Sequence, residues 1–123
     1  MPSSIDSQSV SPPAEFLCGK LTPTMTFGQK VWTLTAQIPA GRVATYRQIA
    51  LALNGRAYRA VGQALHNNPY APAIPCHRVV ASNGRLTGYA HGLAEKERLL
   101  TIEGVPCSNS KVVNLATHLH HFD

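Results

Sequence analysis

Apolar residues recur at helical spacing along the middle of the chain. Four of them follow one another at steps of four, three and four residues: Phe27, Val31, Leu34 and Ile38. This spacing puts them on one face of an amphipathic helix, and Pro39 cannot continue a helix. The sequence therefore predicts a first helix that begins near residue 27 and ends before Pro39.

A second and a third helix are predicted close together. Thr45 and Gln48 have the spacing of a capping box, which predicts a helix that ends at Asn-Gly, residues 54–55. The third helix is predicted from about residue 57 to 67. Two short helices joined by a tight glycine-containing turn form a helix-turn-helix, although an ordinary helical hairpin has the same pattern. Gly62 favours the helix-turn-helix, because a glycine inside a helix costs about 1 kcal/mol relative to alanine and lets another backbone approach closely.

The later part of the chain predicts β structure and one more helix. Two short runs, residues 78–81 and 85–87, flank an Asn-Gly turn and predict a short β-hairpin. A last helix is predicted from about residue 93 to 102. Its inward face is predicted to carry Leu93, Leu99 and Leu100. The fold class that follows is mostly α with a short β-hairpin.

Composition divides the chain into three parts. With 123 residues, 44% of them hydrophobic, the chain fits a single globular domain. Residues 1–25 are rich in Ser and Pro and predict a flexible N-terminal arm, residues 26–105 carry the periodic pattern, and residues 106–123 form a C-terminal tail of unassigned role. No membrane-spanning segment is expected, since no run of about 18 apolar residues occurs. The start lacks an apolar signal region, so the protein is expected inside the cell, in the cytoplasm of a prokaryote or the nucleus of a eukaryote.

The charged residues are unevenly distributed. The chain has 11 Lys and Arg against 6 Asp and Glu, and no carboxylate side chain occurs from Phe16 to Ala94. The same stretch carries eight cations: Lys20, Lys30, Arg42, Arg47, Arg56, Arg59, Arg78 and Arg85. A surface of one charge sign repels itself and suits a partner of the opposite sign. A polyanion such as nucleic acid is therefore the first partner to expect.

Cys76 is the strongest candidate for chemistry. It lies between Pro75 and the pair His77 and Arg78, which puts a potential base and a cation beside the sulfur. Sequence neighbours need not touch through their side chains, and a lone cysteine is commonly a small buried hydrophobe. The cysteines form no CxxC pair and the chain has no dinucleotide-binding glycine loop, so neither a metal nor a cofactor is predicted. A single reactive thiol is the better functional hypothesis.

Several motifs occur in an order that resembles a known family. They are Ile38–Tyr46, Arg59–Gly62, Asn68–Pro69, Ile74–Val79, Gly88–Tyr89 and Glu103–Gly104. Together they closely resemble the C-terminal domain of the O6-alkylguanine-DNA alkyltransferases, also called methylated-DNA–protein-cysteine methyltransferases, over about residues 27–104. The resemblance implies a helix-turn-helix, winged-helix-like catalytic domain. It also implies a DNA-repair enzyme that transfers the alkyl group of O6-alkylguanine, chiefly O6-methylguanine, irreversibly to Cys76 in a single turnover, without a cofactor.

The resemblance also implies roles for single residues. His77 is expected to act through a water as the base that helps to ionise Cys76, and Glu103 to orient His77. Asn68 matches a hinge asparagine that hydrogen-bonds near the thiol. Tyr46 matches a tyrosine that pushes on the target's phosphate and hydrogen-bonds the flipped guanine. Each residue also has a purely structural alternative: Asn68 as a turn residue, which the pattern alone favours, Tyr46 as a half-buried core residue, and Glu103 as a solvated residue of a last helical turn.

The family places the second helix of its helix-turn-helix in the minor groove of DNA, where small residues permit close approach. Arg59 is expected to enter the base stack in place of the flipped base. The DNA-binding residues implied are Tyr46, Ala57, Tyr58, Arg59, Ala60 and Gly62. The substrate pocket implied is lined by Tyr46, Val79, Gly88, Tyr89, Ala90 and His91. His91 is expected to narrow this pocket and to limit large adducts.

Two other classes stay open at this point. A non-enzymatic, alkyltransferase-like lesion-binding protein shares the pattern but usually has another residue, often tryptophan, where this chain has Cys76. A helix-turn-helix transcription regulator explains the basic stretch but leaves residues 75–79 and Glu103 unexplained. The alkyltransferase hypothesis predicts a monomer that binds double-stranded DNA containing O6-alkylguanine through the minor groove.

Overall fold

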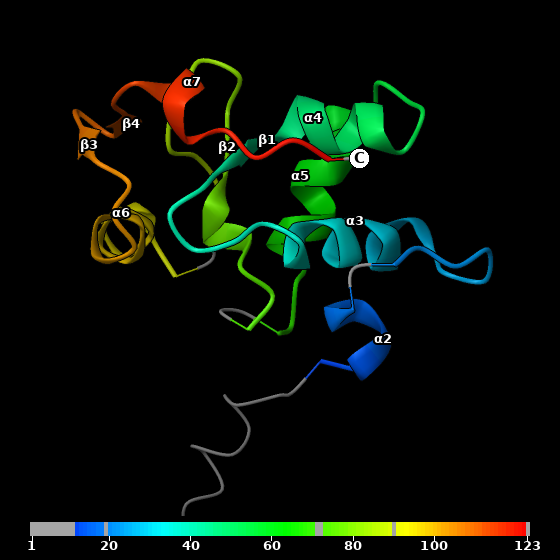
Figure 1. The fold of residues 1–123 in the computed structure, drawn as a ribbon. Helices are drawn as coiled ribbons and strands as arrows, with labels where there is room; N and C mark the ends of the chain where they lie inside the picture. The colour runs from blue at the N-terminus through cyan, green and yellow to red at the C-terminus, as the bar shows by residue number, and fades with distance from the viewer. Residues whose placement is uncertain (1–11, 19, 71–72, 90, 123) are drawn as a thin grey trace, which may run out of the picture.

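A computed structural model describes residues 12–18, 20–70, 73–89 and 91–122 (Figure 1). Its helices are α2 (Ala14–Leu17), α3 (Phe27–Ala36), α4 (Tyr46–Ala52), α5 (Tyr58–His66), α6 (Leu93–Ile102) and α7 (Leu115–His118), with one 3₁₀ turn, η1 (Cys76–Arg78). Its strands are β1 (Ala44–Thr45), β2 (Val79–Val80), β3 (Cys107–Ser108) and β4 (Lys111–Val112). The mostly α fold class is confirmed. Residues 1–11 of the predicted arm and Ala90 of the predicted pocket lie outside the described residues.

Local signals in the sequence set the helix boundaries. Thr45 caps α4 as predicted: its hydroxyl accepts from the Gln48 amide at 3.0 Å, and its own amide donates to the Gln48 side chain at 2.8 Å. Thr26 and Gln29 cap α3 in the same way. The predicted third helix is α5, and the last predicted helix has the bounds of α6.

The main core lies between α3, α4 and α5, which pack together on one side of the molecule (Figure 1). Val31 and Leu34 of α3 are buried as predicted, whereas Phe27, at the start of the same predicted stripe, is 42% exposed. Ile49 of α4 and Val61 of α5 complete the centre of this core. The helix-turn-helix pair α4–α5 therefore rests on α3 and keeps its outer face free of the core.

The β structure differs from the prediction. Residues 78–87 do not form a hairpin; β2 pairs in parallel with β1, Ala44 opposite Val79 and Thr45 opposite Val80. The tight turn at residues 81–85 does form, but beyond it the chain pairs with the C-terminal tail, where Leu86 donates to the Ser110 carbonyl at 2.8 Å. The antiparallel hairpin is β3–β4. The partners come from distant positions, which the local turn pattern could not show.

Part of the predicted flexible arm is folded. Phe16 of α2 is 3% exposed and Met25 is 7% exposed, and both pack with Ile74 in a satellite core. Phe16 meets the rings of Trp32 and Tyr70 edge-on or tilted, with ring centroids 6.0 Å apart in each case. Isolated apolar residues in a Ser/Pro-rich segment show no helical period, so the composition of this segment concealed their burial.

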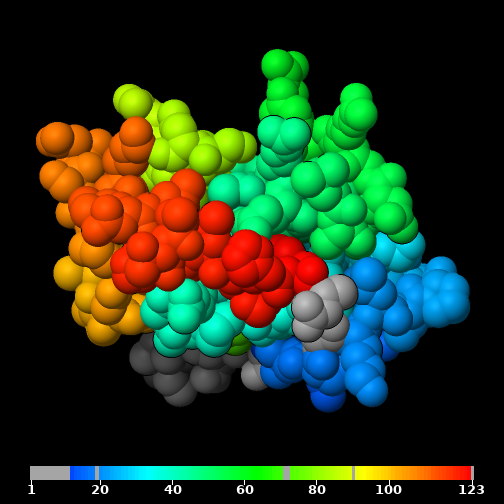
Figure 2. Space-filling view, turned by 45° about the horizontal axis from the view of Figure 1, so that its top comes forward, coloured from blue at the N-terminus to red at the C-terminus, as the bar shows by residue number. Residues whose placement is uncertain are grey.

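The C-terminal tail crosses the molecule beside β1 (Figure 1). Val43 donates to the His118 carbonyl and accepts from the His120 amide, each at 2.8 Å. The Gln48 side chain donates to the His120 carbonyl at 2.9 Å. Figure 2 shows the tail as a red band across one face of the molecule. We call residues 117–120 the C-terminal strap. No helix among the described residues is long and apolar enough to cross a membrane.

Candidate active site

Cys76 lies in η1, at the edge of the main core. The residue is 7% exposed, and its amide donates to the Ile74 carbonyl at 2.8 Å. Burial raises the pKa of the Cys76 thiol, while a hydrogen bond with Asn68 and the charge of Lys96 act in the opposite direction. All three cysteines are free, so no disulfide competes for this thiol.

Glu103 holds His77 and Arg78 together. His77 Nε2 lies 3.0 Å from Glu103 Oε2, and Arg78 binds both carboxylate oxygens, at 2.9 and 2.6 Å. Arg78 also donates to the Ile38 carbonyl at 2.8 Å, which ties the group to the end of α3. Burial by itself raises the pKa of Glu103, but hydrogen bonds from Arg78 and His77 outweigh it and lower the pKa below its usual range. Glu103 is therefore an ionised acceptor and not a solvated end of α6.

This arrangement determines the tautomer of His77. The side chain is 2% exposed, and burial lowers its pKa against the effect of Glu103. A carboxylate only accepts hydrogen bonds, so the neutral ring donates through Nε2 and carries its lone pair on Nδ1. His77 Nδ1 is buried and has no hydrogen-bond partner among the described residues. The ring therefore has a free basic nitrogen inside the site.

Asn68 braces the segment that leads to Cys76. Its side chain donates to the Ile74 carbonyl at 3.0 Å and accepts from the Tyr70 amide at 2.9 Å. Asn68 also acts to lower the pKa of the Cys76 thiol by hydrogen bonding. Its contacts with Tyr70 and Ile74 lie on both sides of the loop that leads to Cys76.

Tyr46 faces the loop that precedes α6. Its hydroxyl donates to the Thr87 carbonyl at 3.1 Å and lies 3.3 Å from the Thr87 hydroxyl. Burial raises the pKa of Tyr46, so the phenol keeps its proton and stays a donor. A Cβ on Gly62 would lie 3.9 Å from the Tyr46 ring, so the small residue leaves this ring open along α5.

Most of the predicted DNA-binding residues meet in one cleft. This Tyr46 cleft has a volume of about 360 Å³ and is lined by Tyr46, Tyr58, Arg59, Gly62, Gln63, His66, Thr87 and Gly88. Ala57 and Ala60 are exposed beside it, at the start and in the first turns of α5. The structure thus brings together Tyr46, Arg59 and Gly62.

The predicted pocket wall is only partly assembled. Val79 is fully buried and belongs to the main core with Cys76. Tyr89 is 8% exposed, and its ring lies edge-on to His77 at 6.3 Å and to His91 at 5.3 Å between centroids. Burial raises the pKa of Tyr89 to about 12. His91 itself is exposed, at the outer end of this aromatic row.

Lys96 is a site residue that the sequence interpretation missed. It is 1% exposed, and its Nζ donates to the Thr87 carbonyl at 2.7 Å. It lies four positions before the buried Leu100, which is the signal that could have placed it on the inner face of α6. Leu93, predicted to face inward, is 42% exposed, because the lysine occupies the interior in its place.

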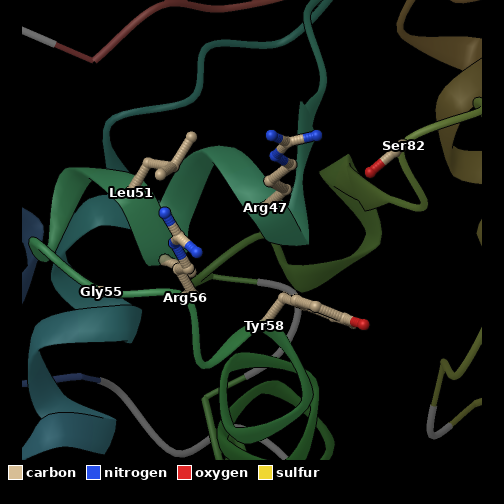
Figure 3. Close-up of a pocket in the computed structure, with 7 residues that line it drawn as sticks. Arg47, Leu51, Gly55, Arg56, Tyr58 and Ser82 are labelled. Carbon is tan, nitrogen blue, oxygen red and sulfur yellow. The ribbon is translucent and has the colours of Figure 1, made fainter.

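A second cleft lies on the other side of Tyr58. This basic cleft has a volume of about 620 Å³ and is lined by Arg47, Ala50, Leu51, Gly55, Arg56, Tyr58 and Ser82. Figure 3 shows that Arg47 comes from α4, Arg56 from the loop before α5 and Ser82 from the loop after β2. Neither arginine forms an ion pair with any described residue. Within the same part of the chain, no three His, Cys, Asp or Glu residues are grouped so that they could hold a metal ion.

The fold and the site together define a helix-turn-helix domain with a buried thiol beside a histidine–carboxylate pair. Comparisons with known proteins agree. Residues 26–105 match the model of the 6-O-methylguanine DNA methyltransferase DNA-binding domain. The chain belongs to the 6-O-methylguanine DNA methyltransferase family, as the sequence motifs predicted.

Individual relatives support the same assignment. The chain is 52% identical over 86 residues to a methylated-DNA–protein-cysteine methyltransferase of Methanosarcina barkeri, a match that covers 68% of this chain and 54% of the relative. The Shigella flexneri protein of that name is 45% identical over 101 residues, 73% of this chain and 58% of its own. The chain therefore spans little more than half the length of these curated relatives.

Two solved structures share the fold. The O6-methylguanine-DNA methyltransferase of Pyrococcus kodakaraensis is 44% identical with a TM-score of 0.61, over 67% of this chain and 48% of its own. Atl1 of S. pombe, solved in complex with damaged DNA containing O6-carboxymethylguanine, is 29% identical with a TM-score of 0.67, over 76% of this chain and 94% of its own.

Proposed function

We propose that the protein repairs DNA by direct reversal, transferring the alkyl group of O6-alkylguanine, chiefly methyl, to Cys76 in one irreversible turnover. The observation that carries this proposal is the buried thiol beside His77, whose Nε2 is engaged by Glu103 and whose Nδ1 is free. The names of the relatives, methylated-DNA–protein-cysteine methyltransferases, support the same reaction.

The chemistry needs a soft nucleophile and a path for one proton. Cys76 loses its proton through a water to His77 Nδ1, and Glu103 stabilises the imidazolium that forms. The thiolate sulfur then forms a bond to the alkyl carbon as the bond from that carbon to O6 breaks. The departing guanine anion takes up one proton through its hydrogen bond with Tyr46, and the His77 imidazolium releases the proton taken from the thiol through water, which restores the tyrosine. Protons and electrons therefore balance without a further reactant.

DNA contact follows from the two clefts on either side of Tyr58. A base modified at O6 is inaccessible in a stacked duplex, so the nucleotide must flip out of the stack. Arg59, exposed on α5, is suited to fill the space that the base leaves, while Ala57, Ala60 and Gly62 let α5 approach the minor groove closely. The unpaired guanidinium groups of the basic cleft are suited to backbone phosphates. We propose that a monomer binds in this way.

A lesion-binding role without chemistry is the second candidate. Its support is the likeness to Atl1, whose structure contains damaged DNA. Cys76 argues against this candidate, because a binding protein needs no thiol and no base beside it. The third class considered, a transcription regulator, has no use for the Glu103, His77 and Arg78 network.

One experiment separates these candidates. The protein is incubated with duplex DNA that contains O6-methylguanine, and the peptides are mapped by mass. We expect a gain of one methyl group on the Cys76 peptide, none on the peptides of Cys18 and Cys107, and none in Cys76→Ala. Tight lesion binding without a mass gain would support the Atl1-like role, and preference for one undamaged sequence would support a regulator.

A further inference from the structure

Lys96 is the largest fully buried side chain of the described residues and carries an ammonium group. A buried charge is costly unless it is paired or well hydrogen-bonded. Among the described residues Lys96 forms no ion pair, and the hydrogen bond found for its Nζ is to the neutral Thr87 carbonyl, at 2.7 Å. Its neighbour Glu95 is instead bound by Arg98. The burial of Lys96 therefore has no structural counter-ion.

The ammonium lies against the same groups as the proposed reaction. The Thr87 carbonyl that accepts from Lys96 also accepts from the Tyr46 hydroxyl, at 3.1 Å. Lys96 Nζ lies 5.9 Å from the centroid of the Tyr46 ring, within reach of a cation–π contact. Lys96, Thr87 and Tyr46 thus form one unit. The same ammonium acts electrostatically on Cys76.

We infer that Lys96 is a positioning residue whose buried ammonium stabilises the Cys76 thiolate and fixes the Tyr46 hydroxyl through the Thr87 carbonyl. This inference rests on the proposed alkyl transfer to Cys76 and goes beyond the roles assigned to His77 and Glu103. At neutral pH Lys96 is protonated, and it exchanges no proton with the substrate. Its missing counter-ion is the thiolate itself, which exists only when the site is ready to react.

Before proton transfer, His77, Tyr46 and Tyr89 do not supply this charge. His77 is neutral until it takes the thiol proton, since burial lowers its pKa. Tyr46 and Tyr89 have raised pKa values and stay uncharged. Burial lowers the pKa of Lys96 to about 8, and a negative Cys76 acts to raise it. Coupling of this kind is mutual, so an ammonium that gains from the thiolate also favours its formation.

The test compares Lys96→Met with Lys111→Met, which removes one exposed lysine charge far from the thiol in sequence. Iodoacetamide alkylation of Cys76 is followed by peptide mass from pH 6 to 10, because alkylation rate follows the thiolate fraction. We expect Lys96→Met to move the midpoint upward by about one unit or more, which makes Cys76 about tenfold slower to alkylate at neutral pH. Lys111→Met is expected to keep the wild-type midpoint.

Two further variants isolate the charge. Lys96→Gln removes the charge but keeps a hydrogen-bond donor toward the Thr87 carbonyl. We expect it to raise the midpoint of Cys76 alkylation as Lys96→Met does. It replaces Lys96→Met if that variant does not fold. Lys96→Arg keeps the charge and is expected to stay near the wild-type midpoint. A purely structural lysine would change the melting temperature of Lys96→Gln and leave the midpoint unchanged, and that result overturns the inference.

The alkylation assay contains no DNA, so it can be judged apart from the proposed function. A wild-type protein that takes no methyl group from O6-methylguanine would refute the repair proposal even if the midpoint shifts as expected. If the wild-type protein repairs O6-methylguanine but the neutral Lys96 variants keep the wild-type midpoint, only the role of Lys96 is refuted, and the repair proposal stands.

Discussion

His77 Nε2 lies 3.0 Å from Glu103 Oε2, and the same carboxylate accepts from Nε and Nη2 of Arg78. Because Arg78 fixes the carboxylate from the other side, Glu103 cannot follow His77 if the ring rotates. The histidine is therefore held in one orientation and one tautomer, with Nδ1 directed away from Glu103.

Replacement of Glu103 by Gln should impair chemistry more than folding. The amide no longer stabilises an imidazolium, so the rate of methyl transfer to Cys76 is expected to fall by about 10²-fold or more. It also leaves Arg78 without its charged partner, which should cost about 1–3 kcal/mol of unfolding free energy. Single-turnover kinetics and denaturant unfolding measure the two effects. The control is Glu95→Gln, which removes only the exposed ion pair with Arg98 and should keep the wild-type rate of methyl transfer. A wild-type rate in Glu103→Gln would contradict the proposed role of Glu103 in stabilising the His77 imidazolium.

Stability should fall as the pH decreases through the ordinary pKa of histidine, 6.5. Burial lowers the pKa of His77, so below 6.5 the unfolded chain binds a proton that the folded chain excludes. Each unit of this difference contributes about 1.4 kcal/mol. The loss continues down to the folded-state pKa of His77. Urea unfolding between pH 5 and 8 tests this, and His77→Gln should flatten the profile while the exposed His121→Gln should not.

Neutralisation of the basic cleft should weaken DNA binding and its salt dependence. Arg47→Gln and Arg56→Gln each remove one unpaired cation, so the slope of log K against log salt should become smaller by about 0.9 for each phosphate that the protein no longer neutralises. Transfer at saturating DNA should be unchanged, since both residues line the basic cleft and neither belongs to the His77, Arg78 and Glu103 network. Arg98→Gln removes the same charge from an ion-paired, 57% exposed position and should leave the slope as it was. Equal slopes in all variants would exclude the cleft as a phosphate site.

Gln48 should matter more for stability than its counterpart Gln29. Both side chains close a capping box, but only Gln48 also donates to the C-terminal strap, at 2.9 Å from the His120 carbonyl. We expect Gln48→Ala to lower the free energy of unfolding by about 1 kcal/mol more than Gln29→Ala does, because it removes one further, partly buried hydrogen bond. Thermal and denaturant unfolding of the two variants, measured side by side, give the difference. Equal losses would show that the strap contributes nothing through this hydrogen bond.

Local signals in the sequence predicted the local parts of the fold. The capping box at Thr45 and the span of α6 depend on residues within one or two turns, and both are found where they were expected. The hairpin was placed wrongly because residues 79–80 pair with the distant β1, and residues 84–86 pair with a tail that has no clear period.

The candidate site shows the same division. Spacing could not show that Glu103 reaches His77 and Arg78 across 26 and 25 positions; only the family motif suggested the first contact. The sequence did not predict a role for Lys96, because a lysine on a short helix is ordinarily solvated. Only the structure shows that its ammonium is buried against the Thr87 carbonyl and the Tyr46 ring.

The C-terminal strap has a consequence for the order of folding. Gln48 and His120 are 72 positions apart, so their contact requires closure of a long loop, which is entropically costly and slow. Helices α3, α4 and α5 can form and pack through nearer contacts well before this closure. The strap then closes on Val43 and on Gln48, so the cap of α4 acquires its full set of hydrogen bonds among the last events of folding.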